Sequence, residues 1–279
     1  MKIIDAFTFF NEIDLLKIRL ELLYDHVDHF IICEANITHS GQRKPYNFAD
    51  NYDLFRKYLD KIIYLQWEPD TSPLDFSIKD EKFNPGAPSW RIETGQRNYI
   101  HTCFKDFDPD DVILVSDADE IWNPSLAGLL RTSDPKKIIH GRLEQQFHYY
   151  YLNCRGFGKF NNIWTSSYFS RIFNLGDNPN LSALRTDGKN MPLIGNAGWH
   201  FSYLGGTDSI IKKIESFAHQ ELNNEKTKER ERVNRCRELG IDYLNRVGHE
   251  WAFHPIEYYP KVIADIMKKN LHLVKTNLA

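Results

Sequence analysis

The first 120 residues alternate short apolar segments with segments of helical periodicity, and this alternation constrains the fold more than any other feature. Apolar runs typical of buried strands lie at residues 3–9, 27–33, 61–65 and 111–115. Helices are predicted between them at residues 12–24, 51–59 and 90–104. Strands that alternate with helices predict an α/β fold with a mostly parallel central sheet.

The second half of the chain is less regular. Residues 137–152 and 167–175 are strand-like, and residues 209–239 predict a helical stretch containing the charged run NEKTKERER. Such a run is typical of a solvated helix face. No internal repeat and no clear linker divides the chain. We therefore expect one domain over residues 1–279, with a regular half at 1–122 and a less regular half at 123–279.

Charge and hydropathy exclude several classes of protein. Lys plus Arg number 35 and Asp plus Glu 38, so the net charge is −3, which does not favour a nucleic-acid partner or an anionic membrane surface. No apolar run is long enough to span a membrane. The opening MKIIDAFTFF contains Asp5 and precedes no small-residue cleavage site, so it predicts a strand and not a signal peptide. We expect a cytoplasmic protein whose Cys33 and Cys103 are buried thiols.

Three polar clusters follow predicted strands, at residues 8–12, 34–39 and 117–120. Ligands bind beyond the carboxyl ends of the strands in parallel α/β sheets. The third cluster places Asp117 and Asp119 two residues apart directly after the apolar run VILVS. Two carboxylates in this arrangement suit a hard divalent cation that is shared with phosphate oxygens. A short Asp-rich surface turn has the same pattern, so the motif alone is weak.

Two enzyme classes use such an element. One is the haloacid dehalogenase-type phosphohydrolase, in which Asp117 would be the nucleophile, and the other is the nucleotide-sugar glycosyltransferase. The phosphohydrolase is disfavoured because a long α/β region precedes the motif and Ile121 stands where Thr or Val is expected. The later segment GDNPN also lacks the final carboxylate of that class. Because aromatic residues make up 14% of the chain, a non-catalytic glycan-binding module is a third alternative.

Four segments in order carry a family resemblance: FTFFNEIDLLKIRLELLYDHVDHFIICEANITHSGQRKP, WRIETGQRN, VILVSDADEI and NAGWHFSYLGG. Over about residues 7–221 the chain resembles glycosyltransferase family 17. The resemblance implies a GT-A-type, Rossmann-like fold with a nucleotide-binding half at 1–122 and an acceptor-side half at 123–279. It also implies inverting transfer of GlcNAc, or a related sugar, from a UDP-sugar to a glycan hydroxyl.

A divalent cation is expected at the paired carboxylates. Asp119 is the predicted direct ligand, and Asp117 is expected to contact the ribose or a metal-bound water. The resemblance implies that His200 completes the site, although His200 beside Trp199 is also compatible with a structural histidine. Imidazole together with carboxylates suits manganese, with magnesium as the alternative. His219 is the competing histidine, and its helical context favours a structural or acceptor-side role.

Donor-binding residues are predicted at the ends of the first two strands. Asn11, Glu12 and Glu34 lie where uridine is expected to bind. Asn11 is also a candidate helix N-cap. The carboxylate of Glu34 is an acceptor for uracil or ribose groups.

Two basic residues are candidates for the diphosphate. Arg97 has a fork-shaped cation suited to phosphate oxygens, although an ion pair with Glu93, four residues earlier, explains it equally well. Lys213, or its neighbour Lys212, is the second candidate, and the competing interpretation is a solvated helix face.

An inverting transfer needs a general base for the acceptor hydroxyl. Asp187 is the predicted base, and Glu144 and Glu221 are the alternatives. Asp187 precedes a glycine, so turn chemistry also accounts for it. Sugar faces stack on aromatic rings, and the candidates for an acceptor wall are Trp164, Tyr149, Tyr150 and Trp199, although most of these rings are expected to be core residues.

Overall fold

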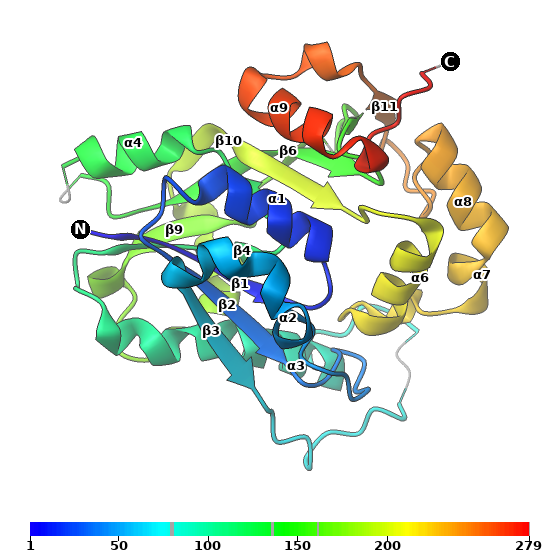
Figure 1. Ribbon diagram of the computed structural model, residues 1–279. Coiled ribbons are helices and arrows are strands. Elements are labelled where there is room, and N and C mark those ends of the chain that lie inside the picture. The colour runs from blue at the N-terminus through cyan, green and yellow to red at the C-terminus, as the bar shows by residue number, and fades with distance from the viewer. Residues whose placement is uncertain (79–80, 135–136, 161, 279) are drawn as a thin grey trace.

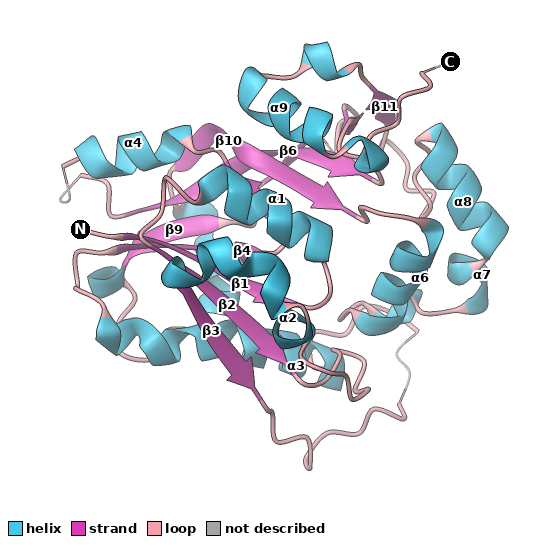
Figure 2. Cartoon of the chain, viewed as in Figure 1, coloured by secondary structure: helices cyan, strands magenta, loops and turns pink. Residues whose placement is uncertain are grey.

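The computed structural model describes residues 1–78, 81–134, 137–160 and 162–278. Its described strands join in one sheet, which helices cover (Figures 1 and 2). The strands are β1 (Ile3–Phe9), β2 (His29–Ala35), β3 (Ile62–Trp67), β4 (Val112–Asp117), β5 (Glu120–Trp122), β6 (His140–Tyr149), β7 (Cys154–Gly156), β8 (Ile163–Trp164), β9 (Tyr168–Arg171), β10 (Leu193–Ser202) and β11 (Trp251–Phe253).

The helices lie mainly between these strands in the chain. The α-helices are α1 (Ile13–Leu23), α2 (Asn47–Asp50), α3 (Pro88–Tyr99), α4 (Ser125–Thr132), α5 (Leu181–Asp187), α6 (Thr207–Ser216), α7 (Glu225–Lys228), α8 (Arg230–Leu239) and α9 (Lys261–Lys269). The 3-10 helices are η1 (Tyr52–Lys61), η2 (Ile100–Asp106), η3 (Ile172–Asn174), η4 (Gly188–Asn190), η5 (Gln220–Leu222), η6 (Ile256–Tyr258) and η7 (Leu271–Leu273).

The first half forms the parallel sheet that the sequence predicts. Strands β3, β2, β1 and β4 lie side by side in that order and all neighbours are parallel. Successive side chains of a strand point to opposite faces, and β4 demonstrates this. Val112 and Leu114 pack with α1, α4 and α9 on one face, whereas Ile113 and Val115 pack with η2 and α5 on the other. The predicted α/β fold is confirmed.

The parallel arrangement does not continue into the second half. Strand β9 lies antiparallel between β4 and β6, and β7, β8 and β11 also pair antiparallel. Strand β10 runs parallel to β6 but antiparallel to β5. The expectation of a mostly parallel sheet is therefore confirmed for β1 to β4, and among the described strands of the second half only the β6–β10 pair agrees with it. Short connections such as that between β6 and β7 reverse the chain, whereas parallel neighbours need a crossover.

Long predicted helices are broken in the structure. The stretch predicted at 209–239 divides into α6, η5, α7 and α8, and the segment at 90–104 is α3 followed by η2. Helix α1 begins at Ile13, so its N-cap position is Glu12 and not the predicted Asn11, and this position makes no side-chain cap hydrogen bond.

Most aromatic residues expected to form an acceptor wall are core residues. Tyr149, Tyr150 and Trp199 are almost fully buried. Tyr149 stacks on Trp251, with ring centroids 4.2 Å apart. Only Trp164 of the predicted wall is partly exposed. The four cysteines are buried free thiols, and within the described residues no helix combines the length and apolarity needed to cross a membrane.

Candidate active site at the carboxyl end of β4

A buried arginine holds the turn that carries the two aspartates. Nη1 of Arg19, on α1, donates to the carbonyl oxygens of Asp117 and Glu120, each at 2.9 Å. The guanidinium also forms a two-pronged ion pair with Asp5 of β1, with N–O distances of 2.6 and 2.7 Å. Arg19 and Asp5 are both fully buried. The path of the β4–β5 turn is therefore tied to α1 and β1 and does not depend on the turn sequence alone.

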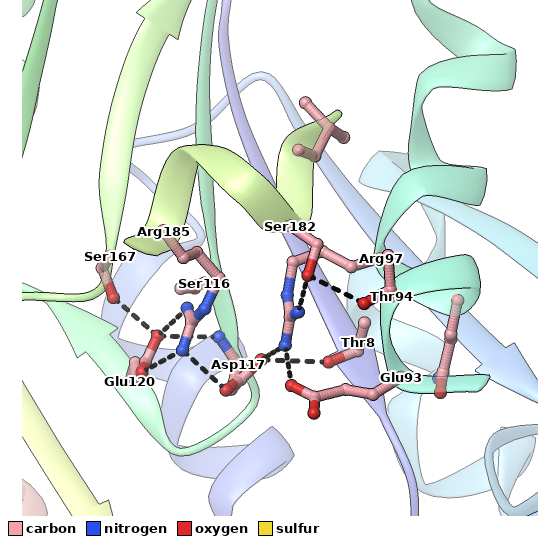
Figure 3. A network of polar contacts seen from close by, with 12 residues as sticks. Thr8, Glu93, Thr94, Arg97, Ser116, Asp117, Glu120, Ser167, Ser182 and Arg185 are labelled. Carbon is pink, nitrogen blue, oxygen red and sulfur yellow. Dashed lines mark hydrogen bonds and ion pairs between the residues drawn. The ribbon is translucent and has the colours of Figure 1, made fainter. Parts of the chain in front are cut away.

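Asp117 is clamped between two arginines (Figure 3). Its Oδ1 accepts from Arg97 of α3 at 2.8 Å, and its Oδ2 accepts from Arg185 of α5 at 2.8 Å. Thr8 of β1 donates to Oδ1 at 3.2 Å. Burial raises the pKa of Asp117, but the two guanidinium groups more than offset it, so the pKa lies well below its usual range. The ionised side chain is still 32% exposed, so a ligand can reach it.

Glu120 is an internal partner of this clamp and not a charge at a helix end. Its side chain is 1% exposed and accepts from both terminal nitrogens of Arg185 at 2.7 Å. Ser167 and Trp164 donate to the same carboxylate at 2.7 and 2.6 Å. Burial raises the pKa of Glu120, and Arg185 outweighs this and lowers it. Glu120 therefore fixes Arg185, which in turn fixes Asp117.

Asp119 faces a second set of residues. Its Oδ2 accepts from Nζ of Lys213, on α6, at 2.7 Å and lies 3.5 Å from Nε2 of His200, on β10. Burial raises the pKa of Asp119, yet Lys213 and His200 together hold it well below its usual range. Burial also lowers the pKa of Lys213, and Asp119 and Glu12 reverse this and raise it. Asp119 and Lys213 are thus both charged at neutral pH.

The ring of His200 is held by aromatic packing. It stacks on Phe147 with a centroid distance of 4.6 Å and an interplanar angle of 3°, and it lies 4.6 Å from Trp164. Its Nδ1 is buried without a hydrogen-bond partner. Gly198, two residues earlier, has a φ of +147°, and a Cβ there would lie 2.3 Å from the carbonyl oxygen of Ile121. With glycine at this position, β10 can lie close to the β4–β5 turn, which places His200 beside Asp119.

A cavity of about 150 Å³ opens beside Lys213. Asn11, Glu12 and Tyr203 also line it. Oε2 of Glu12 accepts from the backbone N–H groups of Phe10 and Asn11 at 3.1 and 3.0 Å. Burial raises the pKa of Glu12. Three of the predicted donor-binding residues, Asn11, Glu12 and Lys213, therefore share one cavity.

The predicted metal ligands are only partly brought together. Asp119 and His200 converge, whereas both oxygens of Asp117 are occupied by arginines. Among the described residues, no group of three or more His, Cys, Asp or Glu side chains has the geometry to hold a metal ion. A carboxylate beside an imidazole is a pair of ligands that suits a divalent cation. Lys213 on Asp119 demonstrates that positive charge is stabilised at this point.

Other predicted site residues have different surroundings. Glu34 is fully buried, and its carboxylate accepts from Lys44 and Tyr64 and from two backbone N–H groups at the start of α2. Glu34 therefore uses its acceptor positions to hold the start of α2 and Tyr64 of β3 in place. Asp187 is exposed and lines a separate cavity of about 230 Å³ with Ser170 and other residues.

In the described part of the chain, neither Glu144 nor Glu221 forms a hydrogen bond or ion pair with Asp119. Glu144 directly precedes Gln145 on β6, and neighbouring strand residues point to opposite faces. Gln145 is the one that turns toward the clamp, because it accepts from Ser167 at 2.9 Å. Glu221 lies in η5 and contacts His219.

Sequence reasoning missed the two arginines that organise the site. Arg185 lies in α5, two residues before Asp187, and Arg19 lies in α1 among apolar residues. Arg19 gave a signal that could have been used. A charged residue on the apolar stripe of a helix is rarely buried unless it is paired. Arg185 gave no comparable signal in its local sequence.

The model of a family described as glycosyltransferase family 17 matches residues 1–270. The β-1,4-mannosyl-glycoprotein 4-β-N-acetylglucosaminyltransferases of Rattus norvegicus and Homo sapiens are each 28% identical over 137 residues, which is 46% of this chain and 23% of theirs. The match thus spans about a quarter of the length of those relatives.

Among solved structures, the 4-diphosphocytidyl-2C-methyl-D-erythritol synthase from Anaerococcus prevotii aligns with a TM-score of 0.35 and 10% identity. The alignment covers 70% of this chain and 86% of that one.

Proposed function

This chain belongs to glycosyltransferase family 17 and is a glycosyltransferase, and we propose that it moves GlcNAc from UDP-GlcNAc to a glycan hydroxyl with inversion at the anomeric carbon. The sugar is taken from the printed names of the relatives, which are N-acetylglucosaminyltransferases. The observation that carries the proposal is the pair of ionised aspartates at the end of β4, with Lys213 and His200 around Asp119. The two earlier alternatives, a phosphohydrolase and a non-catalytic module, do not fit the family.

The two aspartates take different parts in donor binding. Asp117 is ionised and rigidly held, and its exposed fraction suits hydrogen bonds from ribose hydroxyls. Its two arginines also make it a poor nucleophile, because they stabilise its negative charge. Asn11 and Glu12 line the neighbouring cavity and are available to the nucleoside.

The diphosphate needs positive charge, and Lys213 is the residue best placed to supply it. The Lys213 side chain is 28% exposed, and its ammonium group lies between Asp119 and the ring of Tyr203, whose centroid is 5.1 Å away. Arg97, in contrast, is 2% exposed and spends its donors on Asp117, Glu93 and Ser182. We therefore assign the diphosphate to Lys213 and treat Arg97 as a support for Asp117.

A divalent cation, manganese or else magnesium, is part of the proposal. Asp119 and His200 would hold it together with diphosphate oxygens. When bound, it would neutralise the charge that develops on the leaving diphosphate. The chain's own residues orient the donor: the Asp117 clamp aligns the nucleoside, and Lys213 offers its ammonium group to the phosphates.

Calorimetric titration of UDP-GlcNAc into the protein, with and without manganese, tests the proposal. Lys213→Met removes a hydrogen bond to a charged group worth roughly 1.5–3 kcal/mol, so the Kd for UDP should rise about 10- to 100-fold. Lys212→Met is the matched control, because Lys212 is the next residue on α6 and is exposed. Its Kd should stay at the wild-type value.

Two further measurements address the chemistry. Asp119→Asn should abolish the manganese dependence of UDP-GlcNAc binding. NMR of the product formed with a panel of p-nitrophenyl glycosides should give the β-anomer from the α-linked donor. Wild-type protein that binds no nucleotide sugar under any of these conditions contradicts the proposed function.

A further inference from the structure

His219 and Glu221, just beyond the end of α6, form an imidazole–carboxylate pair that the donor site does not use. Nδ1 of His219 lies 2.6 Å from Oε1 of Glu221. An ionised carboxylate can only accept, so Nδ1 carries the proton and donates it. In the neutral imidazole this hydrogen bond leaves the lone pair on Nε2. No residue in the described part of the chain hydrogen bonds Nε2, and the His219 side chain is 43% exposed.

Aromatic rings surround the imidazole on the surface of the protein. Trp90 of α3 meets it edge to face, with centroids 4.8 Å apart, and Phe217 lies 5.6 Å away. Phe83 packs on Trp90 at 5.3 Å, although it is 57% exposed to solvent. An exposed aromatic surface next to a polar dyad suits the apolar face of a sugar ring, whose hydroxyls project from its edge.

Hydrogen bonds fix this segment against the loops at the carboxyl end of the sheet. The backbone N–H of Ser40, in the loop after β2, donates to the carbonyl oxygen of Ser216 at 3.3 Å. The hydroxyl of Ser89, at the start of α3, donates to the carbonyl oxygen of Ala218 at 2.8 Å and is buried. The dyad therefore lies on the ligand-binding side of the fold, where α6 ends in Figure 1.

Helix α3 contacts the dyad near one end and Asp117 near the other. Trp90, Glu93 and Arg97 lie three and then four residues apart, so they share one helix face. Trp90 contacts His219 at one end of this face, and Arg97 contacts Asp117 at the other. Seven residues of α-helix rise about 10 Å. The contact of Trp90 with His219 and the contact of Arg97 with Asp117 are therefore about 10 Å apart along the helix axis, a span that can hold a transferred sugar and an attacking hydroxyl.

Given the glycosyltransferase function proposed above, we propose that His219 is the general base of the transfer and that Glu221 is the positioning residue that holds it in the required tautomer. The acceptor hydroxyl oxygen forms a bond to the anomeric carbon as its proton passes to Nε2 of His219. The bond between that carbon and the β-phosphate oxygen breaks, and its electron pair leaves with UDP. The imidazolium, stabilised by Glu221, then returns its proton to water.

Two variants separate this role from a structural one. His219→Asn keeps a side-chain N–H near the position of Nδ1 and removes Nε2, and Glu221→Gln removes the negative charge. His101→Asn is the matched control, because Nδ1 of His101 also bonds a single neighbour, the carbonyl oxygen of Asn98, but on η2. UDP release from UDP-GlcNAc is measured with water and with p-nitrophenyl β-mannoside as acceptors, and the donor Kd is measured by calorimetry.

General-base removal should lower kcat of His219→Asn by about 10²- to 10⁴-fold. The donor Kd should stay at the wild-type value, and added imidazole should restore part of the rate to His219→Ala. Glu221→Gln should lower kcat by a smaller factor and leave the donor KM unchanged. The proposal is overturned if His219→Asn retains its kcat, or if it loses donor binding together with activity. If wild-type protein binds no UDP-GlcNAc, the proposed function itself has failed, which is a different result.

Discussion

Replacing Arg185 by Met tests whether the arginine clamp organises the site. The side chain is 9% exposed and bonds Glu120, which is 1% exposed, and Asp117. Met keeps an unbranched stem of similar shape but lacks the guanidinium group and its charge. Removing one partner of a buried ion pair costs about 3–5 kcal/mol, because the other charge stays buried. Domains of 150–250 residues lose roughly 2–4 °C per kcal/mol, so the melting temperature should fall by about 6–20 °C.

The pH dependence of this loss gives a sharper test. Arg185 keeps the pKa of Glu120 below its usual value, although burial raises it. A carboxyl group whose pKa is lower in the folded protein stabilises the fold above its unfolded pKa, about 4.3, and this stability is lost as the pH falls through the folded pKa. In the variant, burial and the nearby Asp117 carboxylate both raise the pKa of Glu120, so it rises and protonation relieves the penalty. The difference in melting temperature should therefore shrink between pH 7 and about pH 4.

Thermal denaturation followed by fluorescence, at several pH values, measures both effects. Arg56→Met is the control, because Arg56 is 75% exposed and pairs with Asp53 on the surface. Surface pairs contribute little, so its melting temperature should stay within about 2 °C of wild type. A loss of less than about 2 °C in Arg185→Met at pH 7, or a loss that does not shrink in acid, would refute the reasoning.

Three further variants test other residues. Gly198→Ala should lower the free energy of unfolding, measured by urea denaturation, by about 1–3 kcal/mol. The reason is that the added Cβ would lie 2.3 Å from a backbone oxygen and the residue has a positive φ. Gly195→Ala on the same strand meets no atom within 4 Å and should be tolerated. Glu34→Gln removes the carboxylate that pairs with Lys44 and should lower the free energy of unfolding by about 3–5 kcal/mol, with the Kd for UDP unchanged. A higher Kd for UDP would return Glu34 to the donor site. Asp187→Asn should leave kcat at the wild-type value, and a large loss of kcat with normal donor binding would identify Asp187 as the base instead of His219.

Local sequence patterns were sufficient for the regular half of the fold. Strands β1 to β4 and helix α1 each bury apolar side chains at a fixed spacing, so neighbouring residues carry the information. The second half was harder, because β9 and β10 find partners far away in the chain. The Asp117–Asp119 motif was visible because it follows an apolar strand, and strand ends in parallel sheets bind ligands.

The individual parts played by charged residues could not be predicted in the same way. Glu34 has the position of a donor-binding residue, yet it holds the start of α2. Arg97 offered two interpretations from sequence, and the structure contains the ion pair with Glu93 as well as a bond to Asp117. The role of each residue depends on which charged or polar partner the folded chain places beside it. Spacing along the sequence does not specify that partner.

The sequence by itself determined the α/β class, the position of the two aspartates after β4 and the membership of a glycosyltransferase family. The tertiary structure alone decided which cation each aspartate meets. Asp117 meets Arg185 from 68 residues away, and Asp119 meets Lys213 from 94 residues away. The physical reason is that strands and turns follow from interactions between near neighbours. The ion pairs form only after α5 and α6 have packed beside the sheet and excluded water from their side chains.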